Sequence, residues 1–308
     1  MTAHSKTRLL MCPPDHFGVR YAINPWMDPL SWARDDQALA TASHHEWRKL
    51  RDTLLQLGAS IELVSAAPAV PDLVFTANAA VVLDGKALLA RFRHPERQKE
   101  EIHFESTFGA LKRRGQIDCV DKLPDHVVLE GAGDCVWDTQ RNLFWMGYGP
   151  RSDSAAKHVV SEIFDVEVIG LELTDQRFYH MDTALCPLSR GEVIFVPDAF
   201  TETGRAAVYD RVDADQLIVV DIDDACRLAA NAVSISDTLV MSSCSERLLS
   251  ELTERGYHVV TTPLCSFIRS GGSAFCLTLR LDHLSAAHDI PMPRKQAKVL
   301  SNAVTTNA

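Results

Sequence analysis

The sequence predicts a single-domain α/β protein, built as a closed, propeller-like ring of about five ββαβ units. Three observations support this prediction. Two apolar strands around a tight turn recur along the chain, helix-like stretches separate the copies, and another apolar strand follows each of these stretches. An ordinary α/β sheet is the simpler alternative, but the clear hairpins argue against a purely parallel sheet.

The paired strands open each unit. Four copies occupy residues 76–91, 131–146, 179–197 and 229–242, and a fifth is split between 8–12 and 273–281. In the first copy, Asp84-Gly85 is a hairpin-type turn. An Ala-Asn-Ala triplet at 77–79 and again at 230–232 makes the first and fourth copies alike. Because such a repeat cannot bury its apolar face alone, the copies are expected to pack against one another.

Helices are expected between the strand pairs. In residues 36–57 the apolar side chains recur about every 3.6 residues, and the glycine at 58 provides a C-cap. The stretches 97–114 and 245–255 also end at glycine, and further strands follow at 61–64, 116–120 and 258–261. No linker rich in Pro, Gly or Ser divides the 308 residues. We therefore expect one domain over 1–308, with 283–308 as a peripheral tail.

The charge balance narrows the class of partner. The chain has 31 Lys and Arg against 41 Asp and Glu, a net charge of −10. An acidic surface argues against a nucleic-acid partner and mildly favours a cationic small molecule. No apolar stretch approaches the roughly 20 residues of a membrane helix, and the amino terminus lacks a signal-peptide core. We expect a cytoplasmic protein without a membrane partner, and a homo-oligomer stays open.

The eight cysteines show no C-x-x-C pair and no zinc-finger spacing. In a reducing cytoplasm, structural disulfides are not expected, and most of these thiols are interpreted as small buried hydrophobes. The same absence of ligand spacing makes a metal-dependent hydrolase the weakest interpretation, so no cofactor is expected.

Polar residues gather where the repeats open. If the ring forms, these openings converge on its axis, where a polar pocket can form. The residues are Asp72, Asn78, Glu130, Asp134, His180, Asp182, Asn231, Gly271, Gly272 and Cys276. Taken singly, each has an ordinary structural explanation, because a cysteine between Phe275 and Leu277 is typical of a core and acids beside glycines are typical of turns.

Together, these residue types suit attack on a guanidinium carbon. A guanidinium is a planar cation with five N–H donors, which carboxylates such as Glu130 and Asp182 can accept. The thiolate of Cys276 is the strongest side-chain nucleophile available. His180 would protonate the departing nitrogen and then activate water, with Glu130 orienting the imidazole.

Two arginines and a glycine pair complete the predicted site. Arg97 lies in the first turn of a helix, against the helix dipole, and Arg151 follows a Gly-rich turn. Both can bind a carboxylate in bidentate fashion, although solvated surface arginines are more common. Gly271 and Gly272 would let backbone N–H groups approach the substrate closely.

The motifs resemble those of the guanidino-group-modifying, or pentein, superfamily. They are FTAN (75–78), PERQ (95–98), EGxGD (130–134), GxxxRS (147–152), HMD (180–182) and GGSxxC (271–276). The resemblance spans about residues 11–281 and implies a pseudo-fivefold ββαβ propeller. It implies Cys276 as nucleophile, His180 as acid and base, and Glu130 and Asp182 at the guanidinium. It places Arg97 and Arg151 at the substrate carboxylate and Asp72 near its amino group, with Asp134 and Gly272 also in the binding site.

Asn78 departs from the pattern of arginine deiminases, which typically carry an aspartate there. An amide can accept from a guanidinium and also donate to a ureido oxygen, which suits an enzyme that hydrolyses citrulline as well. Arginine dihydrolases resemble this pattern, and the stretch INPWM (23–27) is similar to theirs. We expect conversion of L-arginine to L-ornithine, carbon dioxide and ammonia. A dimethylargininase, a deiminase, an amidinotransferase and a non-catalytic binder of basic amino acids remain alternatives.

Overall fold

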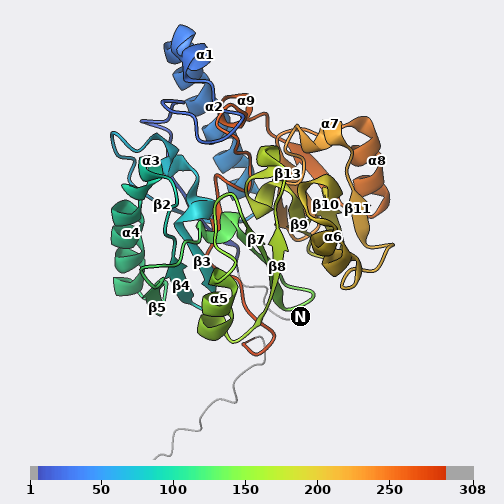
Figure 1. Ribbon diagram of the computed structural model, residues 1–308. Helices are drawn as coiled ribbons and strands as arrows, with labels where there is room; N and C mark the ends of the chain where they lie inside the picture. Colours follow the sequence, from blue (N-terminus) through green and yellow to red (C-terminus); the bar gives the residue numbers. More distant parts are fainter. Residues whose placement is uncertain (1–5, 289–308) are drawn as a thin grey trace, which may run out of the picture.

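The computed structural model describes residues 6–288 and shows an α/β fold of small mixed sheets (Figure 1). Its fifteen described strands form five three-stranded sheets. In order of pairing they are β15 (Leu279–Arg280), β1 (Arg8–Met11) and β2 (Ser60–Leu63); β3 (Ala80–Leu83), β4 (Lys86–Leu89) and β5 (Cys119–Lys122); β6 (Cys135–Asp138), β7 (Leu143–Tyr148) and β8 (Glu167–Glu172); β9 (Leu185–Pro187), β10 (Val193–Phe195) and β11 (Leu217–Val219); and β12 (Val233–Ile235), β13 (Thr238–Met241) and β14 (His258–Thr261).

All five sheets have the same pairing pattern. The middle strand is antiparallel to one neighbour and parallel to the other. In four of the sheets the antiparallel neighbour is reached through a short turn, and in the fifth, β1 and β15 come from the two ends of the described chain. A parallel neighbour requires a crossover, usually through a helix. The described helices are α1 (Pro29–Arg34), α2 (Asp36–Gln56), α3 (Pro95–Gln98), α4 (Glu101–Arg113), α5 (Ala156–Phe164), α6 (Glu202–Tyr209), α7 (Ile222–Ala225), α8 (Glu246–Glu254) and α9 (Cys265–Ile268). In Figure 1, α4, α5, α6 and α8 lie on the outside of the molecule.

The predicted strand pairs are confirmed, including the copy split between the chain ends. There β1 and β15 pair antiparallel, with Leu9 opposite Arg280. The predicted helix 97–114 is wrong at its start, because α3 ends at Gln98 and α4 begins at Glu101. The strand predicted at 116–120 lies at 119–122 as β5.

Five described helices were not recognised in the sequence: the short helices α1, α7 and α9, and the longer helices α5 and α6. Helix α5 ends at Asp165 in a left-handed conformation, with φ of 55°. Helix α6 ends at Asp210 in right-handed helical geometry. Neither end carries a glycine such as those that follow the three predicted helices, so this sequence signal was missing.

The interpretation of the cysteines as buried is also wrong in part, because Cys265 is exposed and three further thiols are only half-buried.

Short 3₁₀ turns connect the strand pairs to the interior. Three of them, η2 (Thr76–Ala79), η3 (Gly131–Gly133) and η5 (Met181–Thr183), immediately precede β3, β6 and β9. They are packed so closely that a Cβ on Gly131 would lie 2.7 Å from the carbonyl oxygen of Ala77, and Gly131 itself has φ of +65°. Only glycine satisfies both constraints without strain. The remaining described 3₁₀ turns are η1 (Pro71–Val74), η4 (Gln176–Phe178) and η6 (Pro197–Ala199).

The inner strands are buried to a degree typical of sheets covered on both faces, whereas β2, β5 and β14 are half-buried or exposed. All four residues of β3 and of β6 are buried, and Trp145 on β7 is fully buried. Burial of such large apolar side chains contributes roughly 1.5–3 kcal/mol each to the free energy of unfolding. This core holds the intervening 3₁₀ turns in fixed positions.

The start of the predicted tail packs against the body of the protein. The backbone N–H of Asp84 donates to the carbonyl of His283 at 2.9 Å, and the carboxylate of Asp84 accepts from the N–H of Ser285. Ser285 is 3 % exposed, whereas Leu284 and residues 286–288 are exposed. The rest of that predicted tail, 289–308, lies outside the described residues.

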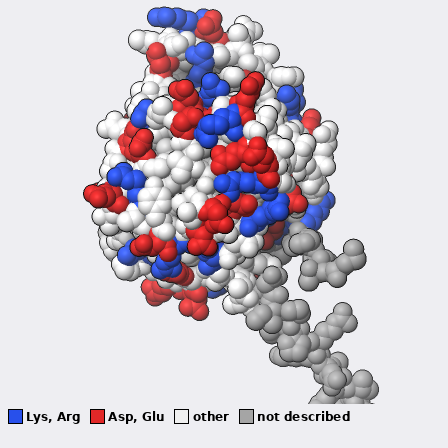
Figure 2. Space-filling view, turned by 90° about the vertical axis from the view of Figure 1, so that its right-hand side faces the viewer, with Lys and Arg blue, Asp and Glu red and all other residues white. Residues whose placement is uncertain are grey.

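The surface over α6 and α8 carries both signs of charge. Figure 2 shows Lys and Arg side chains interspersed with Asp and Glu on this face. Several are paired, such as Arg211 with Glu167 at 2.8 Å and Arg255 with Glu251 at 3.2 Å. No helix within residues 6–288 combines the length and apolarity needed to cross a bilayer.

Candidate active site

A small enclosed cavity lies among the 3₁₀ turns and contains about 250 Å³ of empty space. It is bordered by segments that are far apart in the chain. The lining residues are Ile23, Asn24, Met27, Asp72, Phe75, Asn78, Arg97, Arg151, Tyr179, His180, Ser270, Gly272 and Cys276. Ten residues were given a catalytic or substrate-binding role from the family resemblance and from Asn78, and seven of these ten line the cavity. The other three, Glu130, Asp134 and Asp182, lie behind this lining.

The thiol of Cys276 is 2 % exposed and is contacted by two polar side chains. It donates to Oδ2 of Asp182 at 3.1 Å and accepts from Nδ2 of Asn231 at 3.0 Å. Burial and the adjacent Asp182 raise the pKa of the thiol well above its ordinary value, and Asn231 opposes this rise. Burial also raises the pKa of Asp182 to about 7. In the empty cavity the sulfur therefore holds its proton.

Asn231 holds the segment that carries the thiol. Its Oδ1 accepts from the backbone N–H groups of Ser273 and Cys276, both at 3.1 Å. Its Nδ2 also donates to the carbonyl of Asp182 at 3.1 Å. Because all four contacts are buried, the amide has little freedom to turn away from the sulfur. The sequence placed Asn231 at a repeat opening without assigning it a role, and its match to Asn78 in the Ala-Asn-Ala triplets was the available signal.

His180 forms a buried chain with Glu130 and Arg151. Nε2 of His180 lies 2.8 Å from Oε2 of Glu130, and Nη1 of Arg151 donates to the same oxygen at 3.1 Å. Burial opposes ionisation of Glu130, but Arg151 and His180 hold its pKa far below the ordinary value. Burial lowers the pKa of His180 to about 4, against the effect of Glu130. The resting imidazole is therefore neutral, with its orientation set by an ionised carboxylate.

Asp134 supports this chain from behind. Its Oδ2 accepts from the hydroxyl of Ser152 at 2.5 Å, and Oδ1 accepts from the backbone N–H of Met181 at 3.2 Å. The Ser152 hydroxyl in turn accepts from the backbone N–H of Glu130 at 3.0 Å. Asp134 thus connects the segments that carry Glu130 and His180, and it lies behind the cavity wall.

Arg97 is held by a carboxylate that the sequence analysis missed. Its Nε and Nη2 donate to the two oxygens of Glu100 at 2.9 and 2.8 Å, and both side chains are almost fully buried. Nη1 donates to Oδ1 of Asn78 at 3.0 Å. The pairing of Arg97 with a residue three positions later is a helix-like spacing that could have been recognised in the sequence. Burial raises the pKa of Glu100 to about 7, although Arg97 lowers it.

The opposite side of Asn78 is also fixed. Its Nδ2 donates to the carbonyl of Glu130 at 2.9 Å. A Cβ on Gly133 would collide with this Nδ2, and a Cβ on Gly272 would collide with the ring of Phe75. Gly272 is thus required here for close packing beside Cys276.

Asp72 lies at another edge of the cavity. Its Oδ2 accepts from the Tyr21 hydroxyl at 2.9 Å and its Oδ1 from the Ser270 hydroxyl at 3.1 Å. Burial raises the pKa of Asp72, and Arg97 counteracts this.

Residues 23–26 cross the cavity and bind three separate segments. Asn24 donates to the carbonyl of Ser270 at 3.0 Å, and the Trp26 indole donates to the carbonyl of Arg177 at 2.9 Å. Nη2 of Arg151 donates to the carbonyl of Ile23 at 3.1 Å. These bonds hold the segment across one side of the cavity. The described residues contain no cluster of three or more metal-ligating side chains.

The buried charges around the cavity are mainly acidic. The carboxyl groups of Asp72, Glu100, Glu130, Asp134 and Asp182 surround the guanidinium groups of Arg97 and Arg151. A cation is favoured in such an environment, and a neutral thiol beside a neutral imidazole becomes reactive when a cation lowers the pKa of the thiol.

A small mixed-sheet α/β fold that contains such a thiol, imidazole and carboxylate cluster defines the class: the chain is a pentein-type protein. Residues 13–282 match the family model described as N,N dimethylarginine dimethylhydrolase, eukaryotic. The chain belongs to this family, which confirms the resemblance seen in the sequence.

Three similar proteins are informative. The bifunctional arginine dihydrolase/ornithine cyclodeaminase ArgZ of Synechocystis sp. is 40% identical over 274 residues, 89% of this chain and 37% of ArgZ. The chain therefore spans well under half of that relative. The dimethylarginine dimethylaminohydrolase of Mycobacterium tuberculosis is 34% identical over 89% of this chain and 85% of its own length.

The third is a solved structure, a variant of the N-terminal domain of ArgZ covalently bound to a reaction intermediate. Its TM-score is 0.84 at 38% sequence identity, covering 90% of this chain and 98% of that one.

Proposed function

We propose that this chain is an arginine dihydrolase, which converts L-arginine and two water molecules into L-ornithine, carbon dioxide and two molecules of ammonia. One observation carries the proposal: a buried thiol, a neutral imidazole and the amide of Asn78 belong to one acidic cavity. The similarity to the dihydrolase part of ArgZ supports it.

We further infer that the five sheets close a pseudo-fivefold ring within one domain. The common strand order of the five sheets supports this inference, as does the pairing of β1 with β15. Such a ring brings the turns before β3, β6 and β9 to one axis, where the cavity lies.

In the proposed complex, Asp182 accepts hydrogen bonds from the substrate guanidinium instead of from the thiol of Cys276. Asn78 retains a free acceptor position on Oδ1, because a carbonyl oxygen has two lone pairs and Arg97 uses one. Arg97 and Arg151 bind the substrate carboxylate, and Asp72 binds its amino group. The segment 23–26 must move for the substrate to enter, since Ile23 and Asn24 form part of the cavity wall and the segment is hydrogen-bonded across it.

The first half of the reaction replaces one nitrogen by oxygen. The substrate cation lowers the pKa of Cys276, and its thiolate attacks the guanidinium carbon. His180 receives a proton and delivers it to the departing nitrogen, so that ammonia leaves and a covalent thiouronium remains. Water then attacks the same carbon while His180 takes its proton, and cleavage of the carbon–sulfur bond leaves citrulline bound in the cavity.

The second half uses citrulline without releasing it. The free N–H of the Asn78 amide donates to the ureido oxygen and stabilises the charge that develops there when Cys276 attacks again. A second ammonia leaves, water hydrolyses the resulting thiocarbamate, and the carbamate loses carbon dioxide to give ornithine. An aspartate at position 78 lacks this N–H donor.

A product analysis tests the proposal. Purified protein is incubated with L-arginine, and citrulline, ornithine and ammonia are followed together. We expect ornithine with two ammonia per arginine. Citrulline as the final product contradicts the role of Asn78, and the absence of any product from arginine rejects the substrate.

Dimethylarginine is the second candidate substrate, because the matched family and the Mycobacterium tuberculosis relative carry that activity in their names. It is assayed in parallel. A kcat/KM for dimethylarginine above that for arginine selects this alternative and leaves the Cys276 chemistry in place.

A further inference from the structure

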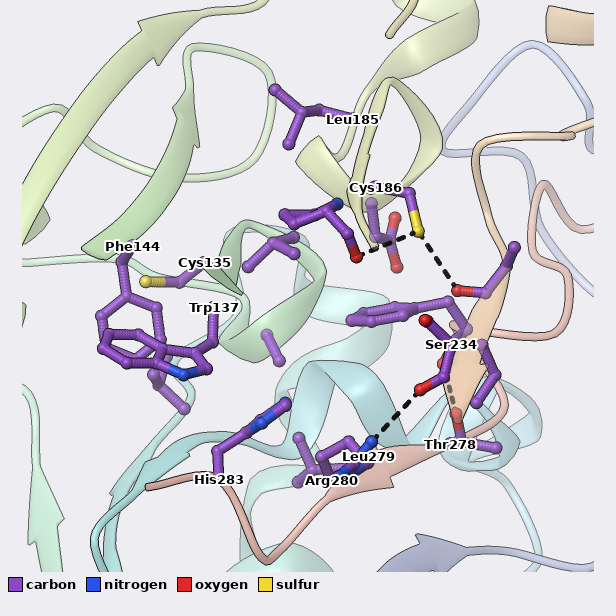
Figure 3. A pocket seen from close by; sticks show the side chains of 18 of the residues that line it. Cys135, Trp137, Phe144, Leu185, Cys186, Ser234, Thr278, Leu279, Arg280 and His283 are labelled. Carbon is purple, nitrogen blue, oxygen red and sulfur yellow. Dashed lines mark hydrogen bonds between the residues drawn. The ribbon is translucent and has the colours of Figure 1, made fainter. Parts of the chain in front are cut away.

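A second and larger cavity adjoins the active-site cavity without sharing any lining residue with it (Figure 3). The non-atom space within it, including the part open to solvent, is about 700 Å³. We call it the Trp137 cavity. Its lining comes from the strands β3, β6, β7, β9, β12 and β15 and from nearby turns, and it includes Trp137, Phe144, Asp182, Cys186, Phe275 and Arg280.

Two buried polar atoms of this lining have no hydrogen-bond partner. They are Nε1 of Trp137, which is 6 % exposed, and Oδ1 of Asp182, which is 2 % exposed. In Figure 3 the edge of the Trp137 indole that carries Nε1 is turned toward the cavity, on the side where His283 lies. An unpaired buried donor or acceptor costs about 1–3 kcal/mol, so a partner inside the cavity would be stabilising.

The basic groups of the lining offer no free positive charge. Arg280 donates through Nε and Nη2 to the two oxygens of Asp282 at 2.9 and 2.8 Å, and through Nη1 to the carbonyl of Ser234 at 3.3 Å. Burial lowers the pKa of His283 to about 3, so this imidazole is neutral near pH 7. An anion would therefore find no free cation here and would lose its hydration without compensation.

We propose that the Trp137 cavity is a second binding site, which takes a small neutral molecule with an apolar ring and one amide-like group. The carbonyl of such a group accepts from Nε1 of Trp137, and its N–H donates to Oδ1 of Asp182. The ring packs against aromatic and aliphatic side chains, which make up most of the cavity wall. This site is distinct from the cavity of the proposed hydrolysis and does not depend on its substrate.

The site is coupled to the nucleophile through one carboxyl group. Oδ2 of Asp182 contacts Sγ of Cys276 at 3.1 Å, and the same carboxyl group, which also carries Oδ1, lines the Trp137 cavity. A hydrogen bond donated to Oδ1 stabilises the ionised form of Asp182. Since a negative charge beside the sulfur disfavours the thiolate, occupancy of the Trp137 cavity is expected to slow reactions of Cys276.

Three fluorinated probes of equal size test the proposal by ¹⁹F NMR and calorimetry on the full chain. They are neutral 4-fluorobenzamide, anionic 4-fluorobenzoate and cationic 4-fluorobenzylamine. We expect the benzamide to bind at least tenfold more tightly than either charged probe. Equal or tighter binding of a charged probe overturns the assigned ligand class, and no binding of the benzamide at millimolar concentration overturns the site.

Two variants locate the binding. Trp137→Phe removes the indole donor and is expected to weaken benzamide binding about tenfold. Trp47→Phe is the matched control, because Trp47 is 4 % exposed and also carries an unpartnered Nε1, but lies outside the cavity lining. Binding that is equal in both variants overturns the location. If Trp137→Phe does not fold, Cys186→Leu serves instead, since it fills part of the cavity and should abolish binding.

The coupling has its own measurement. Alkylation of Cys276 by iodoacetamide is followed by mass spectrometry of the peptide that carries it, with and without saturating 4-fluorobenzamide. We expect a several-fold slower reaction with the probe in the wild-type chain and no change in Trp137→Phe. An unchanged rate in the wild-type chain rejects the coupling through Asp182. Since the assay contains no arginine, its result is independent of the proposed dihydrolase activity.

Discussion

Nδ2 of Asn231 lies 3.0 Å from Sγ of Cys276, although the two residues are 45 positions apart in the chain. The same amide accepts, through Oδ1, from the backbone N–H of Cys276. Asn231 thus both positions the thiol and supplies a hydrogen bond that favours its ionised form. This contact sets the reactivity of the proposed nucleophile, and it leads to the first prediction.

Asn231→Asp should impair turnover by raising the pKa of Cys276. The variant keeps the shape of the side chain but replaces a donor by a second carboxylate beside the sulfur. We expect kcat/KM at pH 7 to fall at least tenfold, with the pH optimum shifted upward by about one unit, since one pKa unit corresponds to a factor of ten. The pH profile of kcat/KM is the measurement. A tenfold loss without any shift would indicate a purely structural role for Asn231.

Cys276→Ser should abolish turnover, because a serine hydroxyl at this position is a far weaker nucleophile than a thiolate. We expect kcat to fall by more than about 10³-fold while arginine still binds, as measured by calorimetry. Cys265→Ser is the matched control, since Cys265 is exposed and lies outside the cavity lining. Substantial residual activity in Cys276→Ser would contradict the assignment of Cys276 as the nucleophile.

Asn78→Asp should make citrulline accumulate. The change removes both N–H groups of the amide: the one that donates to the carbonyl of Glu130, and the free one that we assign to the ureido oxygen in the second half-reaction. We expect the ratio of ornithine to citrulline to fall at least tenfold, a loss typical of removing one such donor. Asn142→Asp is the control, because Oδ1 of Asn142 accepts from the N–H of Ala286 and an aspartate can make the same contact. An unchanged ratio would count against the role of Asn78.

Arg151→Lys should mainly weaken substrate binding. Lysine keeps the charge but loses the planar fork that contacts both Glu130 and the carbonyl of Ile23. We expect KM for arginine to rise about tenfold or more, with a smaller effect on kcat. Arg211→Lys, at an exposed pair with Glu167, should leave both constants unchanged. If KM stays constant in Arg151→Lys, the carboxylate contact is wrong.

Protonation of His180 should destabilise the fold in acid. The folded pKa of about 4 lies below the ordinary value of 6.5. The contribution of the neutral imidazole to stability is therefore fully present above pH 6.5 and is lost as the pH falls through about 4. Urea unfolding between pH 7 and 4 measures it. His180→Gln, which keeps a donor toward Glu130 but does not titrate, should lose less stability over this range than the wild-type chain, and equal losses would contradict the assignment.

The sequence by itself determined the repeating units and the residues that could carry the chemistry. Strand pairs, glycine-ended helices and the motifs around Glu130, His180 and Cys276 are local patterns, and local patterns are readable because backbone geometry depends on neighbouring residues. Helices α5 and α6 were missed because their ends lack the glycine signal.

Only the tertiary structure decided which of these groups meet. The contact of Asn231 with Cys276, the burial of Glu100 against Arg97 and the position of Asp134 behind the cavity depend on packing between distant segments. The Trp137 cavity is equally invisible in the sequence, because its wall is assembled from six strands and their turns. The physical reason is that side-chain hydrogen bonds and cavities depend on distances of a few tenths of an ångström between elements, and sequence patterns specify the elements but not these distances.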